Sequence, residues 1–170
     1  MEELRKYILE CALANGVLCD PGAEGIATAK SIDDLLEMYI KYIDYSLEHN
    51  FPSNKDLLRI AGDYLPGYGI HIDKGFGQIN SRFSVLLGAC KASLMYSGYA
   101  VAQVFVKHQS TADLVLKDNV FVVLDCFDNS IVSVVAEGNS KITINMYGNA
   151  KITKSGNGTI KIIHKLKDTY

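Results

Sequence analysis

Between Ser110 and Thr159 the sequence repeats every ten residues, and this period constrains the fold more than any other feature. Four of the repeats end in asparagine, and each of these asparagines follows an aspartate or a glycine. Such residues adopt turn and left-handed backbone conformations at low cost. Each repeat is therefore predicted to be one short strand followed by one turn.

Apolar and polar residues alternate inside each repeat, and the apolar ones occupy even-numbered positions throughout. This period of two is typical of strands with one buried face. The intervening residues, such as Lys117 and Ser133, are mixed in character, so the opposite face is expected to be mostly solvated. The predicted buried positions are Ala112, Leu114, Leu116, Val122, Leu124, Cys126, Val132, Val134, Ala136, Ile142, Ile144, Met146, Ile152, Ile160 and Ile162.

The constant parity of these positions indicates how the strands are arranged. A two-residue hairpin turn at Asp128-Asn129 would pair Cys126 with Ile131, which places even positions beside odd ones. Parallel stacking by translation, as in a β-solenoid, keeps the parity and lets the turn asparagines form a hydrogen-bonded ladder. Ten residues are too few for a closed coil, so we expect two repeats per coil. Turns of three residues would also preserve parity, which leaves an antiparallel meander or sandwich as the alternative.

The first 68 residues carry helical signals instead. Ser31 is the predicted cap of a helix that runs to about Asn50, with Asp33 and Asp34 in its first turn, where acidic groups favour the positive end of the helix dipole. Pro66-Gly67 is predicted to stop the last helix. Further helices are predicted over residues 2–15, 20–30 and 53–65.

The sequence thus predicts an α+β protein. A helical module covers residues 1–68, and a strand and glycine-bearing linker cover residues 69–80. A β-solenoid-like domain, a single-stranded β-helix of ten-residue repeats, covers residues 81–170. With 170 residues and 48% apolar content, the chain can bury a substantial core.

Charge and hydropathy argue against several classes of partner. The first 68 residues hold six basic and twelve acidic side chains, a balance that opposes binding to nucleic acid phosphates. The longest uncharged run, Ala92 to Val106, is too short and too polar to cross a bilayer, and the chain starts without an apolar signal segment. We therefore expect a cytoplasmic protein with no nucleic acid and no membrane partner.

Motifs of enzymes and cofactor sites are missing from the sequence, including the nucleophile elbow, the P-loop, the dinucleotide fingerprint and metal-ligand spacings. His71 and Asp73 lie two apart on a predicted strand and could orient an imidazole, but a surface contact is the simpler interpretation. Asp113 and Asp125 are the nearest approach to paired carboxylates for an enzyme acting on a polysaccharide, and they occupy different repeat positions. We expect no catalytic residue, no cofactor and no metal.

Aromatic residues supply the first candidate contact surface. Phe127 and Tyr147 lie twenty residues apart, as do Asp125 and Asn145. In a coil of two repeats each pair is predicted to stack on one exposed sheet, which would suit a protein partner or a sugar. The simpler interpretation is that the helical module or another subunit covers this strip.

Lysines supply the second candidate site. Lys141 and Lys161 are predicted to occupy one position in successive coils, and Lys151 lies midway between them in sequence. A basic stripe could hold a small anionic ligand, such as a nucleotide, at a subunit junction. The simpler interpretation is that lysines protect an open sheet end from pairing with another chain.

The run from Gly138 to Ile152 (GNSKITINMYGNAKI) resembles the short strands of β-solenoid proteins such as bactofilins and the head domains of bacterial adhesins. The whole chain is similar to uncharacterised proteins of gut-bacterial prophages and mobile elements. This resemblance implies a structural or host-directed binding protein, although bactofilin-like chains generally lack such a helical module. We expect a non-enzymatic structural or protein-interaction protein that forms homo-oligomers through its repeats. A binder of a small anionic ligand and a polysaccharide-active enzyme are the alternatives.

Overall fold

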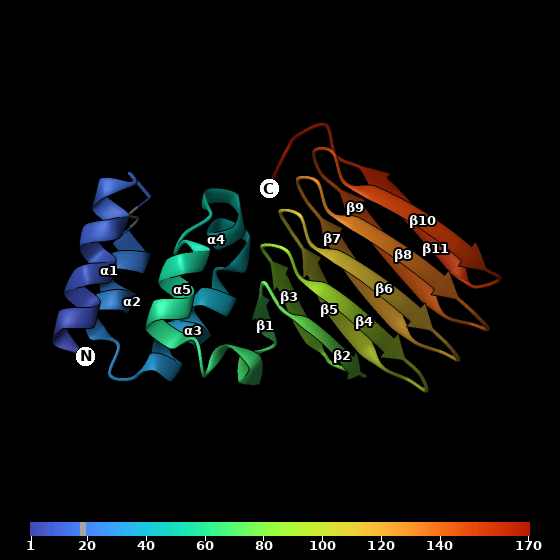
Figure 1. Ribbon diagram of the computed structural model, residues 1–170, viewed down its shortest axis with the longest axis horizontal. Helices are drawn as coiled ribbons and strands as arrows, with labels where there is room; N and C mark the ends of the chain where they lie inside the picture. The colour runs from blue at the N-terminus through green and yellow to red at the C-terminus, as the bar shows by residue number, and fades with distance from the viewer. Residues whose placement is uncertain (18–19) are drawn as a thin grey trace. The chain divides into compact units, whose positions relative to one another are not determined.

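The computed structural model describes residues 1–17 and 20–170, which divide into two compact units, residues 1–68 with Tyr170 and residues 69–169. Helices make up the first unit and strands the second, as the ribbon in Figure 1 shows. The α+β class predicted from the sequence is confirmed. None of the helices in the described ranges combines the length and the apolar character that a bilayer crossing requires.

Helix capping in the first unit follows the sequence signals. The side chain of Ser31 accepts a hydrogen bond from the backbone N–H of Asp34, whose carboxylate accepts from the N–H groups of Lys30 and Ser31 and so has a lowered pKa. The single helix predicted from Ser31 to Asn50 is wrong, because the backbone leaves helical geometry at Tyr42, with φ −111° and ψ 35°. The helices are α1 (Glu2–Ala14), α2 (Asp20–Thr28), α3 (Ile32–Lys41), α4 (Ile43–His49), α5 (Asn54–Ala61) and the 3-10 helix η1 (Leu65–Tyr68).

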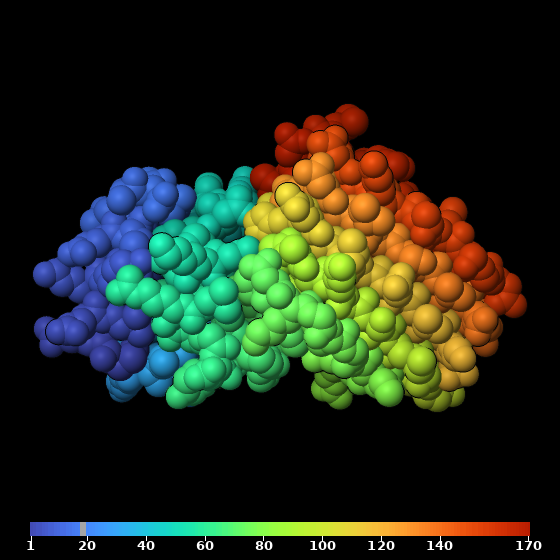
Figure 2. Space-filling view, in the orientation of Figure 1, coloured from blue at the N-terminus to red at the C-terminus, as the bar shows by residue number. Residues whose placement is uncertain are grey.

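The second unit is a β-solenoid of two parallel sheets. Successive strands alternate between a six-stranded sheet, in the order β1-β3-β5-β7-β9-β11, and a five-stranded sheet, in the order β10-β8-β6-β4-β2. Figure 2 shows the coils as successive bands of colour from green to red. The strands are β1 (Ile70–Ile72), β2 (Gly75–Ile79), β3 (Phe83–Leu87), β4 (Lys91–Tyr96), β5 (Val101–Val106), β6 (Thr111–Leu116), β7 (Phe121–Cys126), β8 (Ile131–Ala136), β9 (Lys141–Met146), β10 (Lys151–Gly156) and β11 (Thr159–His164).

Strand register confirms that each coil takes two repeats. Leu114 lies opposite Leu94 on one side and Val134 on the other, and every described strand pair is parallel. The antiparallel meander is therefore excluded. Residues 75–79 do not form a linker. They form β2, and Gly75 of β2 lies opposite Lys91 of β4.

The even-numbered positions of the repeats point between the two sheets and form the core, as predicted, although Met146, Ile152, Ile160 and Ile162 are only partly buried. Val122, Leu124, Val132, Val134 and Ala136 are fully buried there. Burial of one such aliphatic side chain contributes roughly 1.5–3 kcal/mol, so this column of residues is the main source of the unit's stability.

The turns between strands are joined from coil to coil by side chains. Asp118 has a left-handed backbone with φ +63°, and its carboxylate accepts a hydrogen bond of 2.8 Å from the N–H of Gly98. Asn139 donates from its amide to the side-chain oxygen of Asn119 at 3.2 Å. The predicted asparagine ladder is therefore present at this pair, and it satisfies polar groups that strand pairing leaves open.

Candidate functional site

The aromatic and polar pairs predicted from the sequence do meet in the structure. The rings of Phe127 and Tyr147 stack with centroids 4.7 Å apart and an interplanar angle of 16°. Beside them the side-chain amide of Asn145 donates to a carboxylate oxygen of Asp125. However, Phe127, Tyr147 and Asp125 are all buried, so the predicted exposure of this contact surface is wrong.

Lys107 is also buried, and it lies in one column with Phe127 and Tyr147, at the same position of successive coils. The Nζ of Lys107 lies 5.3 Å from the centroid of the Phe127 ring and 3.3 Å from a carboxylate oxygen of Asp128. A buried ammonium is stable only with partners, and here a ring face and a carboxylate supply them. This column is consequently a packed structural element, and it does not offer a free surface to a sugar or a protein.

The three candidate lysines are exposed, but the structure does not bring them together. Lys141 lies opposite Thr159 in the six-stranded sheet, whereas Lys151 belongs to the five-stranded sheet. The prediction that Lys141 and Lys161 share one coil position is wrong, because only residues 157–158 separate β10 from β11, whereas residues 147–150 separate β9 from β10. No compact anion site forms among them.

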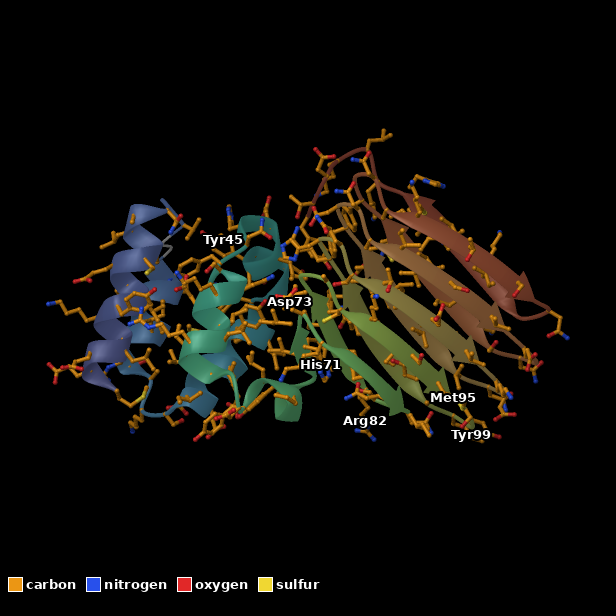
Figure 3. All side chains as sticks on the ribbon, in the orientation of Figure 1. Tyr45, His71, Asp73, Arg82, Met95 and Tyr99 are labelled. Carbon is orange, nitrogen blue, oxygen red and sulfur yellow. The ribbon has the colours of Figure 1, made fainter. Side chains whose placement is uncertain are left out.

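The candidate catalytic residues His71 and Asp73 each interact with another residue. The ring of His71 stacks on Phe76 with centroids 3.7 Å apart, and burial is the main cause of its lowered pKa. Asp73 instead accepts a hydrogen bond of 2.7 Å from the N–H of Ala89. Figure 3 labels His71 and Asp73. Asp113 and Asp125 lie on β6 and β7, which belong to different sheets.

An apolar surface that the sequence reasoning missed runs along the outer face of the five-stranded sheet. Four side chains lie opposite one another on β2, β4, β6 and β8, and we call them the apolar stripe. Ile79 and Met95 are 71% and 43% exposed, and Tyr99, in the turn after β4, is 84% exposed; Figure 3 labels the last two. The apolar stripe consists of Ile79, Met95, Val115 and Val135.

Polar and charged residues border the apolar stripe on both sides. Asp113 and Ser133 lie opposite each other two positions before the stripe, and Lys117 and Glu137 follow two positions after it. Asp113, Lys117 and Glu137 are exposed, and within the described residues none of the three forms an ion pair. An apolar centre with a polar rim is the usual composition of a protein interface.

The repeat itself carried a signal for this surface. Val115 and Val135 are apolar residues at the same odd-numbered repeat position, where a solvated strand face would favour polar side chains. Comparisons of the chain with protein-family models, with curated proteins and with solved structures found no match.

Proposed function

We propose that the protein is a non-enzymatic structural protein that self-associates through the outer face of its five-stranded sheet. The supporting observation is the apolar stripe, in which Ile79 and Met95 expose most or nearly half of their side chains. Contiguous exposed apolar side chains with a polar rim mark association surfaces, because their burial removes apolar area from water. The occupant of this surface is a second copy of the chain.

Charge complementarity supports a second copy of the chain as the partner at this surface. A two-fold axis parallel to the apolar stripe places each stripe residue against its own counterpart, as an isologous interface requires. The same axis places the position two residues before the stripe in one copy opposite the position two residues after the stripe in the other copy. Asp113 of each copy then faces Lys117 of the other, and Ser133 faces Glu137. Both contacts are favourable, and each occurs twice.

Sedimentation equilibrium of the full chain tests this function. The wild-type protein is expected to have the mass of a dimer, and Met95→Lys that of a monomer, because the substitution places an ammonium against its counterpart at the centre of the interface. Gln103→Lys is the matched control, since Gln103 is exposed on β5 in the other sheet and should leave the dimer intact. A monomeric wild type at all concentrations would contradict the proposal.

Native mass spectrometry of the same samples separates this function from the alternative. A dimer mass without excess supports a structural role. A constant excess of a few hundred daltons per subunit would favour the binder of a small anionic ligand instead.

A further inference from the structure

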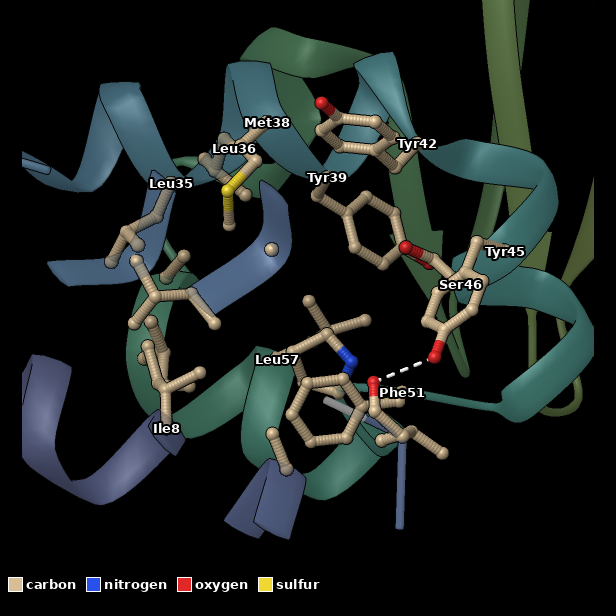
Figure 4. Close-up of a pocket in the computed structure, with 17 residues that line it drawn as sticks. Ile8, Leu35, Leu36, Met38, Tyr39, Tyr42, Tyr45, Ser46, Phe51 and Leu57 are labelled. Atoms are coloured by element: carbon tan, nitrogen blue, oxygen red, sulfur yellow. Dashed lines mark hydrogen bonds between the residues drawn. The ribbon is translucent and has the colours of Figure 1, made fainter. Parts of the chain in front are cut away.

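The helical unit contains a pocket of about 150 Å³. Small residues create the space, because Ala12 on α1 and Ala61 on α5 face it where larger side chains would fill it. Figure 4 shows the pocket surrounded by side chains from these helices and from α3 and α4. An empty cavity destabilises a domain through lost packing contacts, and a unit this small has little stability to lose.

The walls of the pocket are apolar and carry no charge. The described residues that line it include aliphatic side chains, Phe51, three tyrosines and Ser46, without a lysine, arginine, histidine, aspartate or glutamate. A charged ligand would therefore lose its hydration without an ionic partner in return. A cavity of this size lined by leucine, isoleucine and phenylalanine stays dry and accepts benzene.

The hydroxyl of Tyr39 belongs to the wall of the pocket. Tyr39 is 6% exposed, and burial raises the pKa of its hydroxyl. Across residues 1–17 and 20–170 no hydrogen bond to that hydroxyl is found. The neighbouring Tyr45 differs, because its hydroxyl donates to the carbonyl oxygen of Val17 at 2.7 Å, the dashed line in Figure 4. This hydroxyl is not one of the fully buried polar atoms that lack a partner, so it keeps some accessible surface and is open to a ligand.

We infer that this pocket binds a small neutral aromatic molecule with one hydrogen-bonding group, which pairs with the hydroxyl of Tyr39. Size sets the upper limit at about one or two fused rings, given that a cavity of ~150 Å³ accepts benzene. The uncharged wall excludes carboxylates and amines. The Tyr39 hydroxyl favours a ligand with a polar atom over a pure hydrocarbon.

Phenol, toluene and benzoate are the probes, because they match in size and differ in polarity and charge. Each is titrated into the ¹⁵N-labelled full chain while amide shifts are followed by NMR. Phenol is expected to shift the amides of residues that line the pocket, toluene to bind more weakly, and benzoate to cause no change. Tyr39→Phe should remove the preference for phenol over toluene. Equal binding of benzoate, or an unchanged preference in Tyr39→Phe, would overturn the inference.

Variants whose larger side chains fill the pocket provide the second part of the experiment. Ala12→Leu and Ala61→Leu each place a larger side chain in the space, and both residues are buried. Phenol binding is expected to be lost in whichever variant keeps the wild-type helical circular dichroism. Two separate positions are used because overpacking can prevent a variant from folding. Undiminished phenol shifts in a folded, filled variant, or no shifts in the wild type, would show that the pocket is not a binding site.

Discussion

Lys154 lies opposite Val134 in the parallel ladder between β10 and β8, so an inward-facing column of apolar residues ends in a lysine. The preceding members of the column are Leu94 and Leu114, and both are buried. A further strand from another chain would enclose the ammonium without a partner. Inward-pointing charges of this kind prevent extension of a sheet at its edge. The last coil therefore resists extension by another chain, and the outer face of the sheet remains the surface that we propose for self-association.

Lys154→Ile is expected to promote end-to-end association, because it restores the apolar column at the open end. Light scattering after size-exclusion chromatography should show species larger than those of the wild type. Lys151→Ile is the control, since Lys151 is exposed on the same strand and faces outward. Equal masses for the two variants would argue against Lys154 as the blocking residue.

Val134→Asp is expected to unfold the β-solenoid, because an unpaired carboxylate in a fully buried position costs several kcal/mol. Thr153→Asp, which places the same group at an exposed outward position, should change the unfolding free energy by less than about 0.5 kcal/mol. Thermal melting followed by circular dichroism distinguishes the two. Wild-type melting of Val134→Asp would remove Val134 from the core.

Gly156→Ala tests the tight loop after β10. Gly156 has φ +96°, and a Cβ there would lie 2.0 Å from the carbonyl oxygen of Ala136. Gly98→Ala is the matched control. Gly98 also has a positive φ of +70°, but a Cβ added there would have no atom within 4 Å. Backbone strain alone should cost Gly98→Ala about 1–2 kcal/mol, whereas Gly156→Ala should lose more, as measured by urea unfolding. Equal losses would mean that the loop at residues 156–158 shifts freely.

His108 is expected to make stability depend on pH. Its Nδ1 accepts a hydrogen bond of 3.1 Å from the N–H of Gly88, which requires an unprotonated nitrogen, and burial lowers its pKa below the usual 6.5. The unfolded chain then binds a proton at higher pH than the folded chain does. Stability should therefore be constant above about pH 6.5 and fall as the pH drops below that value.

A His108→Asn variant isolates this effect. Asparagine tolerates the left-handed backbone at φ +64° and retains an acceptor, but it does not titrate. Urea midpoints at about pH 8 and about pH 5, on either side of the usual histidine pKa, should differ less for His108→Asn than for the wild type. The same difference in both proteins would assign the pH dependence to other groups.

Local patterns predicted the features that depend on neighbours in sequence. The inward positions around Val134 follow from strict alternation, and the stacking of Phe127 on Tyr147 follows from a constant coil length. The burial of Phe127 could not be predicted, because it depends on what packs over an outward face. The apolar pattern of the helix after Ser31 stays in phase across Tyr42, so it did not reveal the break there.

Features that depend on one loop or on packing could not be predicted from the sequence either. The register of Lys161 changed because the last turn lost two residues, which the repeat could not indicate. The pocket beside Tyr39 results from the relative placement of helices, and no motif encodes an unfilled space. The repeat marked the apolar stripe only at Val115 and Val135, because Ile79 and Met95 precede the regular repeats.

A charge swap between Asp113 and Lys117 tests self-association most directly. Each single reversal, Asp113→Lys or Lys117→Asp, should place like charges opposite each other across the interface and shift the protein toward monomer in sedimentation velocity. The double variant Asp113→Lys with Lys117→Asp restores opposite charges and should recover the wild-type dimer. Single variants that sediment as the wild type, or a double variant that remains monomeric, would contradict association through this face.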